Sequence, residues 1–221
     1  MRIFLVMLLS ALFANCIACD NWGEFNVKAG LQFAGKIKIE YKIPDPDEKD
    51  EALNLNTGFI VSGEFLIPCE YFSESVENFK FGMGVSYLFP RDYKRNANVS
   101  ISYLPVYFTL QVNPFIGTQN KVFYGIFLKG NVGHNFLFDF KDKGLYNNSK
   151  LDKTGGLHYA FSTGYEFPFG LIIDLSYNVY KSSIEISHYD DATLPGDRNY
   201  FANDDLIYRN VTFNIGYKFK V

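Results

Sequence analysis

The end of this chain alternates strictly between apolar and polar side chains from residue 211 onward. Its odd positions carry Val211, Phe213, Ile215, Tyr217, Phe219 and Val221, and its even positions carry only Thr, Asn, Gly and Lys. Successive side chains of a β-strand point to opposite faces, so a period of two predicts a strand that separates an apolar surface from a polar one. Any fold proposed for the chain has to place one face of this strand in an apolar environment and the other in a polar one.

The same alternation recurs along most of the sequence. It predicts eight strands, at residues 25–43, 57–67, 79–89, 99–112, 121–140, 157–167, 171–186 and 210–221. Short turns and longer polar segments separate them alternately, and the longer segments are residues 44–56, 91–98, 141–156 and 187–205. Strands joined in this order predict an all-β, antiparallel, up-and-down sheet.

Composition indicates the surroundings of that sheet. Hydrophobic residues make up 48% of the chain, yet the mean hydropathy is only -0.06, because apolar and polar residues are interleaved. Aromatic residues reach 18%, and membrane β-barrels use such residues as girdles at both interfaces. An open sheet edge in lipid would leave backbone groups unpaired, so we expect a closed transmembrane barrel. The alternative is a soluble barrel with its apolar face inside, as in lipocalins.

The N-terminal residues have the features of an export signal. Arg2 precedes an apolar run over residues 3–13, and Ala18 ends a small-residue cleavage site. We expect a signal peptide at residues 1–18 and one barrel domain at residues 19–221. Cys19 would then be the first mature residue, so lipidation of Cys19 is an alternative to plain cleavage. A Cys19–Cys69 disulfide is open as well, since exported proteins meet an oxidising compartment.

The last eight residues resemble the C-terminal signal by which the outer-membrane assembly machinery recognises its clients. The residues that carry the resemblance are Asn214, Gly216, Phe219 and Val221. The chain thereby resembles the small eight-stranded bacterial outer-membrane β-barrels. The resemblance implies outer-membrane localisation, a monomer, and lipids and the barrel assembly machinery as partners. It also implies periplasmic termini and turns, with the four longer segments outside the cell.

The polar face of the predicted strands supplies the candidate functional residues. An eight-stranded barrel has an interior just wide enough for side chains to fill, so charges on this face should pair across the lumen. The predicted lumen charge network is Lys28, Lys36, Lys38, Glu40, Glu64, Lys80, Asp174 and Lys218, and Lys220 is expected to point inward as well. A plugged barrel is one hypothesis, and a narrow ion-selective pore is the other.

The apolar residues of the predicted fourth strand change from odd to even positions partway along it. Residues 99, 101 and 103 are apolar on one parity, and residues 104 to 112 on the other. Because Pro105 cannot donate a hydrogen bond to the ladder, we expect a bulge beside it.

The outer segments 44–56, 141–156 and 187–205 are candidate contact surfaces for an extracellular ligand. The last is the longest, and it offers Tyr189, Tyr200 and Phe201.

Catalytic, metal and cofactor sites are not expected. His158 and Ser162 share a strand face, but four residues of strand separate them by about 13 Å, which is beyond hydrogen-bond reach. His134 is interpreted as a wall residue, and His188 beside two aspartates does not complete a metal-ligand set. The net charge of -3 excludes an extended nucleic-acid footprint. We therefore expect no enzyme and no nucleic-acid partner.

Overall fold

The strands of the computed structural model are long and antiparallel. The structure describes residues 23–33, 35–41, 51–72, 76–92, 99–116, 121–142, 150–187 and 201–221. Its strands are β1 (Glu24–Gln32), β2 (Lys36–Tyr41), β3 (Glu51–Asn54), β4 (Gly58–Pro68), β5 (Phe79–Asp92), β6 (Val99–Val112), β7 (Ile126–Asp142), β8 (Lys150–Thr154), β9 (Gly156–Glu166), β10 (Leu171–Ser187) and β11 (Phe201–Lys220). Two single-turn 3-10 helices, η1 (Cys69–Tyr71) and η3 (Lys121–Phe123), lie in turns.

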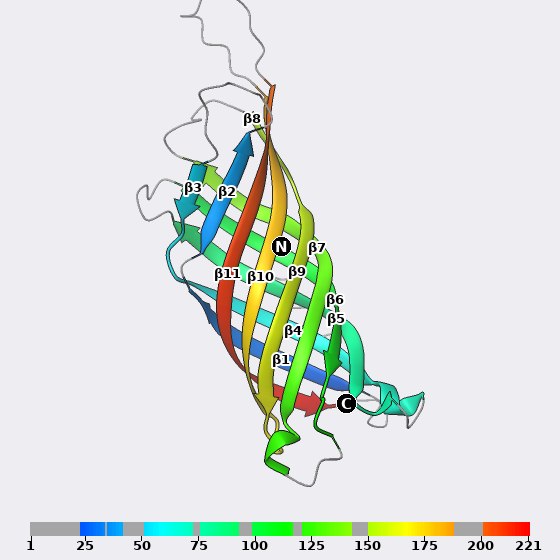
Figure 1. Cartoon of the computed structure of the whole chain (residues 1–221). Helices are drawn as coiled ribbons and strands as arrows, with labels where there is room; N and C mark the ends of the chain where they lie inside the picture. The colour runs from blue at the N-terminus through cyan, green and yellow to red at the C-terminus, as the bar shows by residue number, and fades with distance from the viewer. Residues whose placement is uncertain are drawn as a thin grey trace, which may run out of the picture.

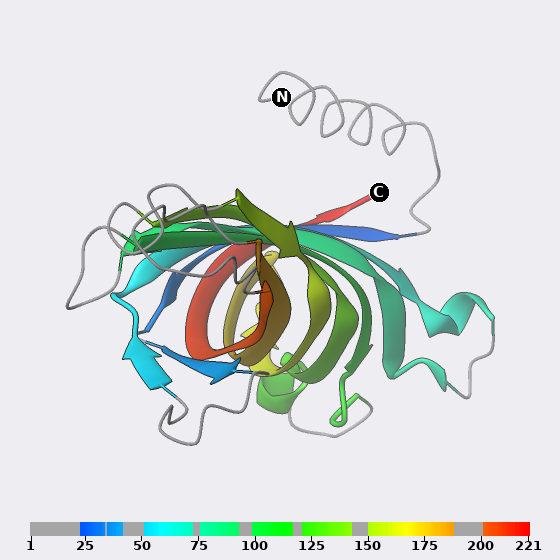
Figure 2. The ribbon, with the colours of Figure 1, turned by 90° about the horizontal axis from the view of Figure 1, so that it is seen from above.

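Within these described residues, eight of the strands close into a ring. Each pairs antiparallel with the next in the order β1, β4, β5, β6, β7, β9, β10, β11, and β11 pairs back with β1. Figure 1 shows the strands inclined around a common axis, and Figure 2 shows the ring seen along it. The strands β2, β3 and β8 extend the wall at one end. The predicted all-β, eight-stranded antiparallel up-and-down barrel is confirmed.

The first described residue, the last residue and three turns lie at the same end of the barrel. Gly23 and Val221 exchange two backbone hydrogen bonds of 3.0 Å, which join the start of the first strand to the end of the last. The turns between β4 and β5, between β6 and β7, and between β9 and β10 lie at this end too, beside the C mark of Figure 1. We call it the terminal end. In the described part of the chain, no helix is long and apolar enough to cross a membrane.

The outer wall is apolar and the inner wall polar over most of the barrel. Large hydrophobic side chains are exposed outward, among them Phe59 at 63%, Phe108 at 66% and Phe161 at 57%. Buried inward positions include Asn26, Ser86, Thr109, Asn178 and Thr212. This arrangement is the reverse of a soluble barrel, because burial in water would place the hydrophobic side chains inside. The lipocalin alternative is therefore wrong.

The first predicted strand is interrupted, and this changes which way its second half faces. On β11, Gln32 pairs with Thr212 but Lys36 pairs with Arg209, so four residue steps on one side oppose three on the other. One extra residue of this kind is a β-bulge, and it turns the following side chains to the opposite face. Ile37 is accordingly fully buried inside the barrel, whereas Lys36 is exposed outside.

The bulge predicted beside Pro105 is not found in β6, whose odd-numbered side chains stay buried from Ile101 to Asn113. The extra residues lie in its two partner strands, between Leu88 and Arg91 of β5 and between Leu137 and Asp139 of β7. The register with β7 shifts between Ser102 and Tyr103. Ile101 and Tyr103, which the alternation placed outward, are buried inside at 3% and 1% exposure. The apolar residues therefore change parity along β6 because the lumen lining changes there from polar to apolar. The side chains of Ile101 and Tyr103 face inward and not outward.

Several predicted boundaries need correction. The last strand begins at Phe201 and not near residue 210, so the predicted 187–205 segment is a strand at each end. The 44–56 and 141–156 segments likewise contain β3 and β8. The signal peptide, Cys19, Tyr189, Tyr200 and His188 lie outside the described residues. Cys69 is half-buried in η1, and its bridge to Cys19 stays a prediction.

The barrel interior as candidate functional site

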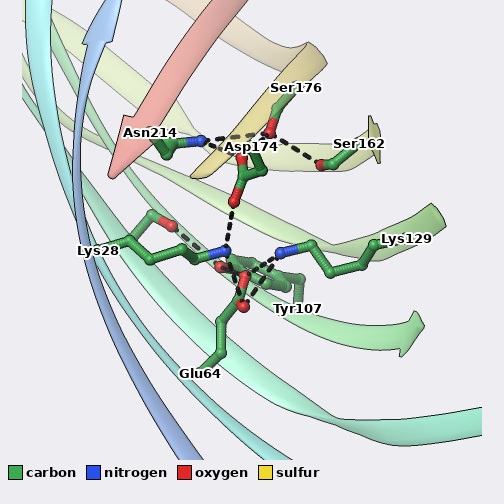
Figure 3. A network of polar contacts seen from close by, with 9 residues as sticks. Lys28, Glu64, Tyr107, Lys129, Ser162, Asp174, Ser176 and Asn214 are labelled. Atoms are coloured by element: carbon green, nitrogen blue, oxygen red, sulfur yellow. Dashed lines mark hydrogen bonds and ion pairs between the residues drawn. The ribbon is translucent and has the colours of Figure 1, made fainter. Parts of the chain in front are cut away.

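The middle of the lumen holds a buried ionic cluster, which we call the central network: Lys28, Glu64, Lys129 and Asp174 (Figure 3). Lys28 and Lys129 reach Glu64 from opposite sides, with Nζ to carboxylate oxygen distances of 2.9 and 2.8 Å. The second carboxylate, on Asp174, lies 3.2 Å from Lys28 Nζ. Two positive and two negative charges balance, so the central network is neutral.

Neutral side chains saturate the two carboxylates. The Tyr107 hydroxyl donates to Glu64 over 3.1 Å. The Asn214 amide donates to Asp174 over 2.6 Å, and the Ser176 hydroxyl donates to the same carboxylate over 2.9 Å. A buried carboxylate is stable only when such bonds replace its lost hydration. The central network therefore ties β1, β4, β6, β7, β10 and β11 together across the lumen.

A second ionic cluster, the mouth cluster, lies at the terminal end: Glu24, Lys80, Glu166 and Lys218. Lys80 Nζ lies 2.7 Å from Glu24 and 3.3 Å from Glu166. Lys218 pairs with the same two carboxylates. These side chains are 9–15% exposed, against 0–4% in the central network. The mouth cluster is also neutral, with two lysines and two glutamates.

The opposite half of the lumen is filled by apolar and aromatic side chains, which we call the apolar layer. Its buried members are Ile37, Leu55, Ile60, Leu88, Ile101, Tyr103, Leu137, Tyr180, Leu206 and Tyr208. The Tyr103 and Tyr180 rings stack with centroids 5.5 Å apart, and Tyr208 stacks on both at 6.0 and 5.6 Å. Arg91 donates from Nη1 to the Tyr208 hydroxyl over 2.5 Å, and its guanidinium lies 5.2 Å from the ring centre.

A cavity of about 20 Å³ lies between the central network and the apolar layer. This volume holds about one water molecule. His158 borders it and stacks on Tyr180 with ring centres 4.8 Å apart. Neither ring nitrogen of His158, nor Asn131 Oδ1, has a hydrogen-bond partner among the residues that the structure describes. The cavity is therefore polar and too small for a solute larger than water.

The predicted lumen residues divide into three groups. The structure places Lys28, Glu64 and Asp174 in the central network, and Lys80 and Lys218 in the mouth cluster. Lys36 is outside the lumen because of the bulge after β1, and Lys38 is half-exposed on the same outward face, so their assignment to the lumen is wrong. The side chain of Glu40 lies outside the described part. Lys220 is exposed at the terminal end.

Other lumen residues were missed by sequence analysis. Lys129 lies in the predicted 121–140 strand, to which no faces were assigned, although it stands alone between Leu128 and Gly130. Its position opposite Ser162 of β9 places it inward. Glu24 directly precedes the predicted first strand, and Glu166 lies at the end of the predicted 157–167 strand, where the next turn begins. The sequence signal that could have placed these residues in the lumen is a charged residue at a strand end that alternates with aromatic residues.

The residues of the predicted assembly signal take clear positions in the last strand. Asn214 points inward to Asp174, and Gly216 packs against Lys28. Phe219 is 43% exposed on the outer wall, and Val221 pairs with Gly23. Recognition by the assembly machinery stays a prediction, but Asn214 and Gly216 both contact residues of the central network.

The histidines do not form a catalytic arrangement in the described part of the chain. The Ser162 hydroxyl donates to Ser176 over 2.8 Å and not to His158. His134 is exposed on the outer wall beside Phe136, with ring centres 4.7 Å apart. No group of three or more potential metal-ligating side chains occurs among the described residues.

The fold defined by this ring and its filled interior is that of the small eight-stranded outer-membrane β-barrels. Among similar solved structures is the outer membrane protein OprG from Pseudomonas aeruginosa, with 15% identity over 90% of this chain and 97% of that chain, at a TM-score of 0.55. Another is the outer membrane protein AlkL in DMPC lipid bilayers, with 13% identity over 92% and 93% of the two chains, at 0.52. No protein-family model and no curated protein matches the chain.

Proposed function

We propose that this chain is an integral outer-membrane β-barrel with a plugged lumen, which serves the membrane as a structural or surface-interaction protein. The observation that carries the proposal is the filling of the interior. Two neutral ionic clusters and the apolar layer occupy successive levels of the lumen, and the cavity between them is about 20 Å³. A closed ring with an apolar outer wall satisfies the backbone in lipid.

This proposal includes export by the signal peptide at residues 1–18, assembly by the barrel assembly machinery, and outer-membrane lipids as the surroundings of the wall. With the first described residue and the last residue at the terminal end, that end faces the periplasm under this proposal. The outer segments between the strands then form the contact surface for an extracellular ligand, with residues 187–205 first. The barrel itself carries out no catalysis under this proposal.

Single-channel recording of the refolded mature chain in a planar bilayer tests the plug. Heat-modifiable gel migration shows first that the barrel has formed. We expect a folded barrel that does not conduct, because described side chains fill the lumen at three successive levels. Steady, discrete openings in a barrel shown to be folded would contradict the plugged lumen.

A narrow channel is the alternative function. The polar cavity beside His158 and Asn131 favours it, since unpartnered polar groups within a lumen can accommodate water. The Glu64→Gln variant separates the two proposals. A plugged barrel should lose stability and stay silent. A channel should change its preference between cations and anions, because the central network then carries one more positive charge.

A further inference from the structure

Basic side chains gather on the outer wall where β2, β11 and β10 lie side by side. Lys36, Arg209 and Lys181, one from each strand, are all exposed. On β11 the neighbours of Arg209, which are Tyr208 and Asn210, are buried at 0% and 4% exposure, so Arg209 points outward. The same alternation with buried neighbours holds on β10 and β2. We call these three residues the basic patch.

The strand register brings the basic patch together. Lys36 and Arg209 are direct cross-strand partners. Lys181 pairs with Ile207, one outward position along β11 from Arg209, and Lys38 pairs with Ile207 from the other side. Like charges directly opposite each other destabilise a sheet. Folding alone therefore gives no reason for this arrangement, and an anion bound between the side chains would offset the repulsion.

The outward residues on either side of the basic patch change character in a consistent order. On β10, Val179 pairs directly with Arg209 and is 2% exposed. The next outward row toward the terminal end is Phe33, Val211 and Tyr177, which are 49%, 36% and 48% exposed. Away from it, beyond Ile207, lies Asp205, which accepts a hydrogen bond from Ser183. The wall thus passes from apolar to basic and then to acidic within a few residues.

We propose that the basic patch binds the phosphate-bearing headgroup of a lipid in the outer leaflet, whose acyl chains cover Phe33, Val211 and Tyr177. The inference rests on the proposed function, since the patch lies at the end of the apolar wall opposite the periplasmic termini. Adjacent strands are about 4.8 Å apart, so the patch spans about 10 Å across three strands. The Arg209 guanidinium can bind phosphate with two parallel hydrogen bonds.

Charge complementarity favours a lipid anion here. The chain as a whole carries a net charge of -3, so a cluster of cations on one face is a local departure. The structure shows no ion pair between Lys36, Lys181 or Arg209 and any acidic side chain that it describes. A phosphate supplies negative charge at this level of the wall, whereas an uncharged lipid supplies none.

Native mass spectrometry of the refolded barrel can measure lipid retention directly. The probes are diphosphoryl lipid A, the same lipid after removal of its phosphates, and inorganic phosphate as a competitor. The variant is K36Q/K181Q/R209Q, and the matched control is K220Q, whose side chain is exposed at the other end of β11. Each cation near an anionic lipid surface contributes about fivefold in binding, so the triple variant should lose roughly a hundredfold.

We expect the wild type and K220Q to retain the phosphorylated lipid in preference to its dephosphorylated form, and the triple variant to show no preference. Equal retention by the wild type and the triple variant would overturn the inference. Displacement of the lipid by inorganic phosphate at equal concentration would also overturn it, because the site would then bind free phosphate. Insertion into phosphatidylcholine liposomes and heat-modifiable migration test the barrel separately, so failure of the proposed function is distinguishable.

Discussion

Gly216 and Lys28 are cross-strand partners where the last strand meets the first. A Cβ atom built on Gly216 would lie 2.3 Å from Lys28 Cγ and 2.5 Å from the Val27 carbonyl oxygen. The absence of a side chain at 216 therefore lets the Lys28 stem lie flat across β11. From there its ammonium group reaches both carboxylates of the central network.

We expect Gly216→Ala to lower the free energy of unfolding by about 1–3 kcal/mol, because the added methyl group overpacks this contact. Urea unfolding in detergent micelles, followed by circular dichroism, measures the change. Gly130→Ala is the matched control, since a Cβ at Gly130 would meet nothing within 4 Å. That control should leave stability unchanged or raised by about 0.5–1 kcal/mol. Equal losses in both variants would contradict the packing role of Gly216.

Removal of one cation from the central network should be costly. In Lys129→Met, Glu64 stays buried at 2% exposure with Lys28 and Tyr107 as its remaining partners. We expect a loss of about 3–5 kcal/mol in unfolding free energy, which is typical when a buried charge loses its partner. The double variant E64Q/K129M should lose less than the sum of its single variants, because the two residues are in direct contact. Simple additivity in the unfolding experiment would refute the coupling.

Removal of a cation from the mouth cluster should destabilise the barrel less than removal of one from the central network. The Lys218 side chain is 15% exposed, so water partly replaces its contribution when it is removed. We expect Lys218→Met to cost less than Lys129→Met under identical unfolding conditions. Lys220→Gln is a control at an exposed position, and it should stay within about 0.5 kcal/mol of wild type. A larger loss at Lys218 than at Lys129 would show that burial does not set the order.

Tyr208→Phe tests the polar contact within the apolar layer. The variant keeps the stacked ring but removes the hydroxyl that accepts from Arg91, which is 5% exposed. A buried donor without its partner costs about 1–3 kcal/mol, so we expect destabilisation of that size. Tyr177→Phe, on the outer wall at 48% exposure, should change stability little. Thermal unfolding of both variants measures the two changes in stability. Equal changes in Tyr208→Phe and Tyr177→Phe would contradict the role of the Arg91–Tyr208 contact.

Regular alternation made the fold predictable from sequence. A period of two assigns faces along an unbroken strand, and it placed Lys28, Glu64 and Asp174 on the inward face where the structure has them. Pairing was not predictable in the same way. Glu64 and Lys129 are 65 residues apart in sequence, and only the register of three intervening strand pairings brings their charged atoms together.

The apolar layer was not predictable because period two separates two faces without saying which one is inside. Ile101 and Tyr103 are apolar residues on an inward parity, and Ile37 reaches the interior through a bulge. A bulge is a single extra residue, and its position depends on the partner strand. The sequence around Lys36 alternates as regularly as it would without one. The outward assignment of the lysines therefore required the pairing with β11.

The extra residue between β1 and β2 means that chain length alone decides which compartment of the barrel each side chain of β2 enters. Deleting one residue from the link at 33–35 would keep every amino acid of β2 and yet exchange its two faces. Ile37 would then move to the lipid side, and Lys36 would enter the apolar layer as a buried, unpaired charge. Insertions or deletions of one residue in this link should therefore be far less tolerated than substitutions there, whereas a change of two residues would restore the original facing.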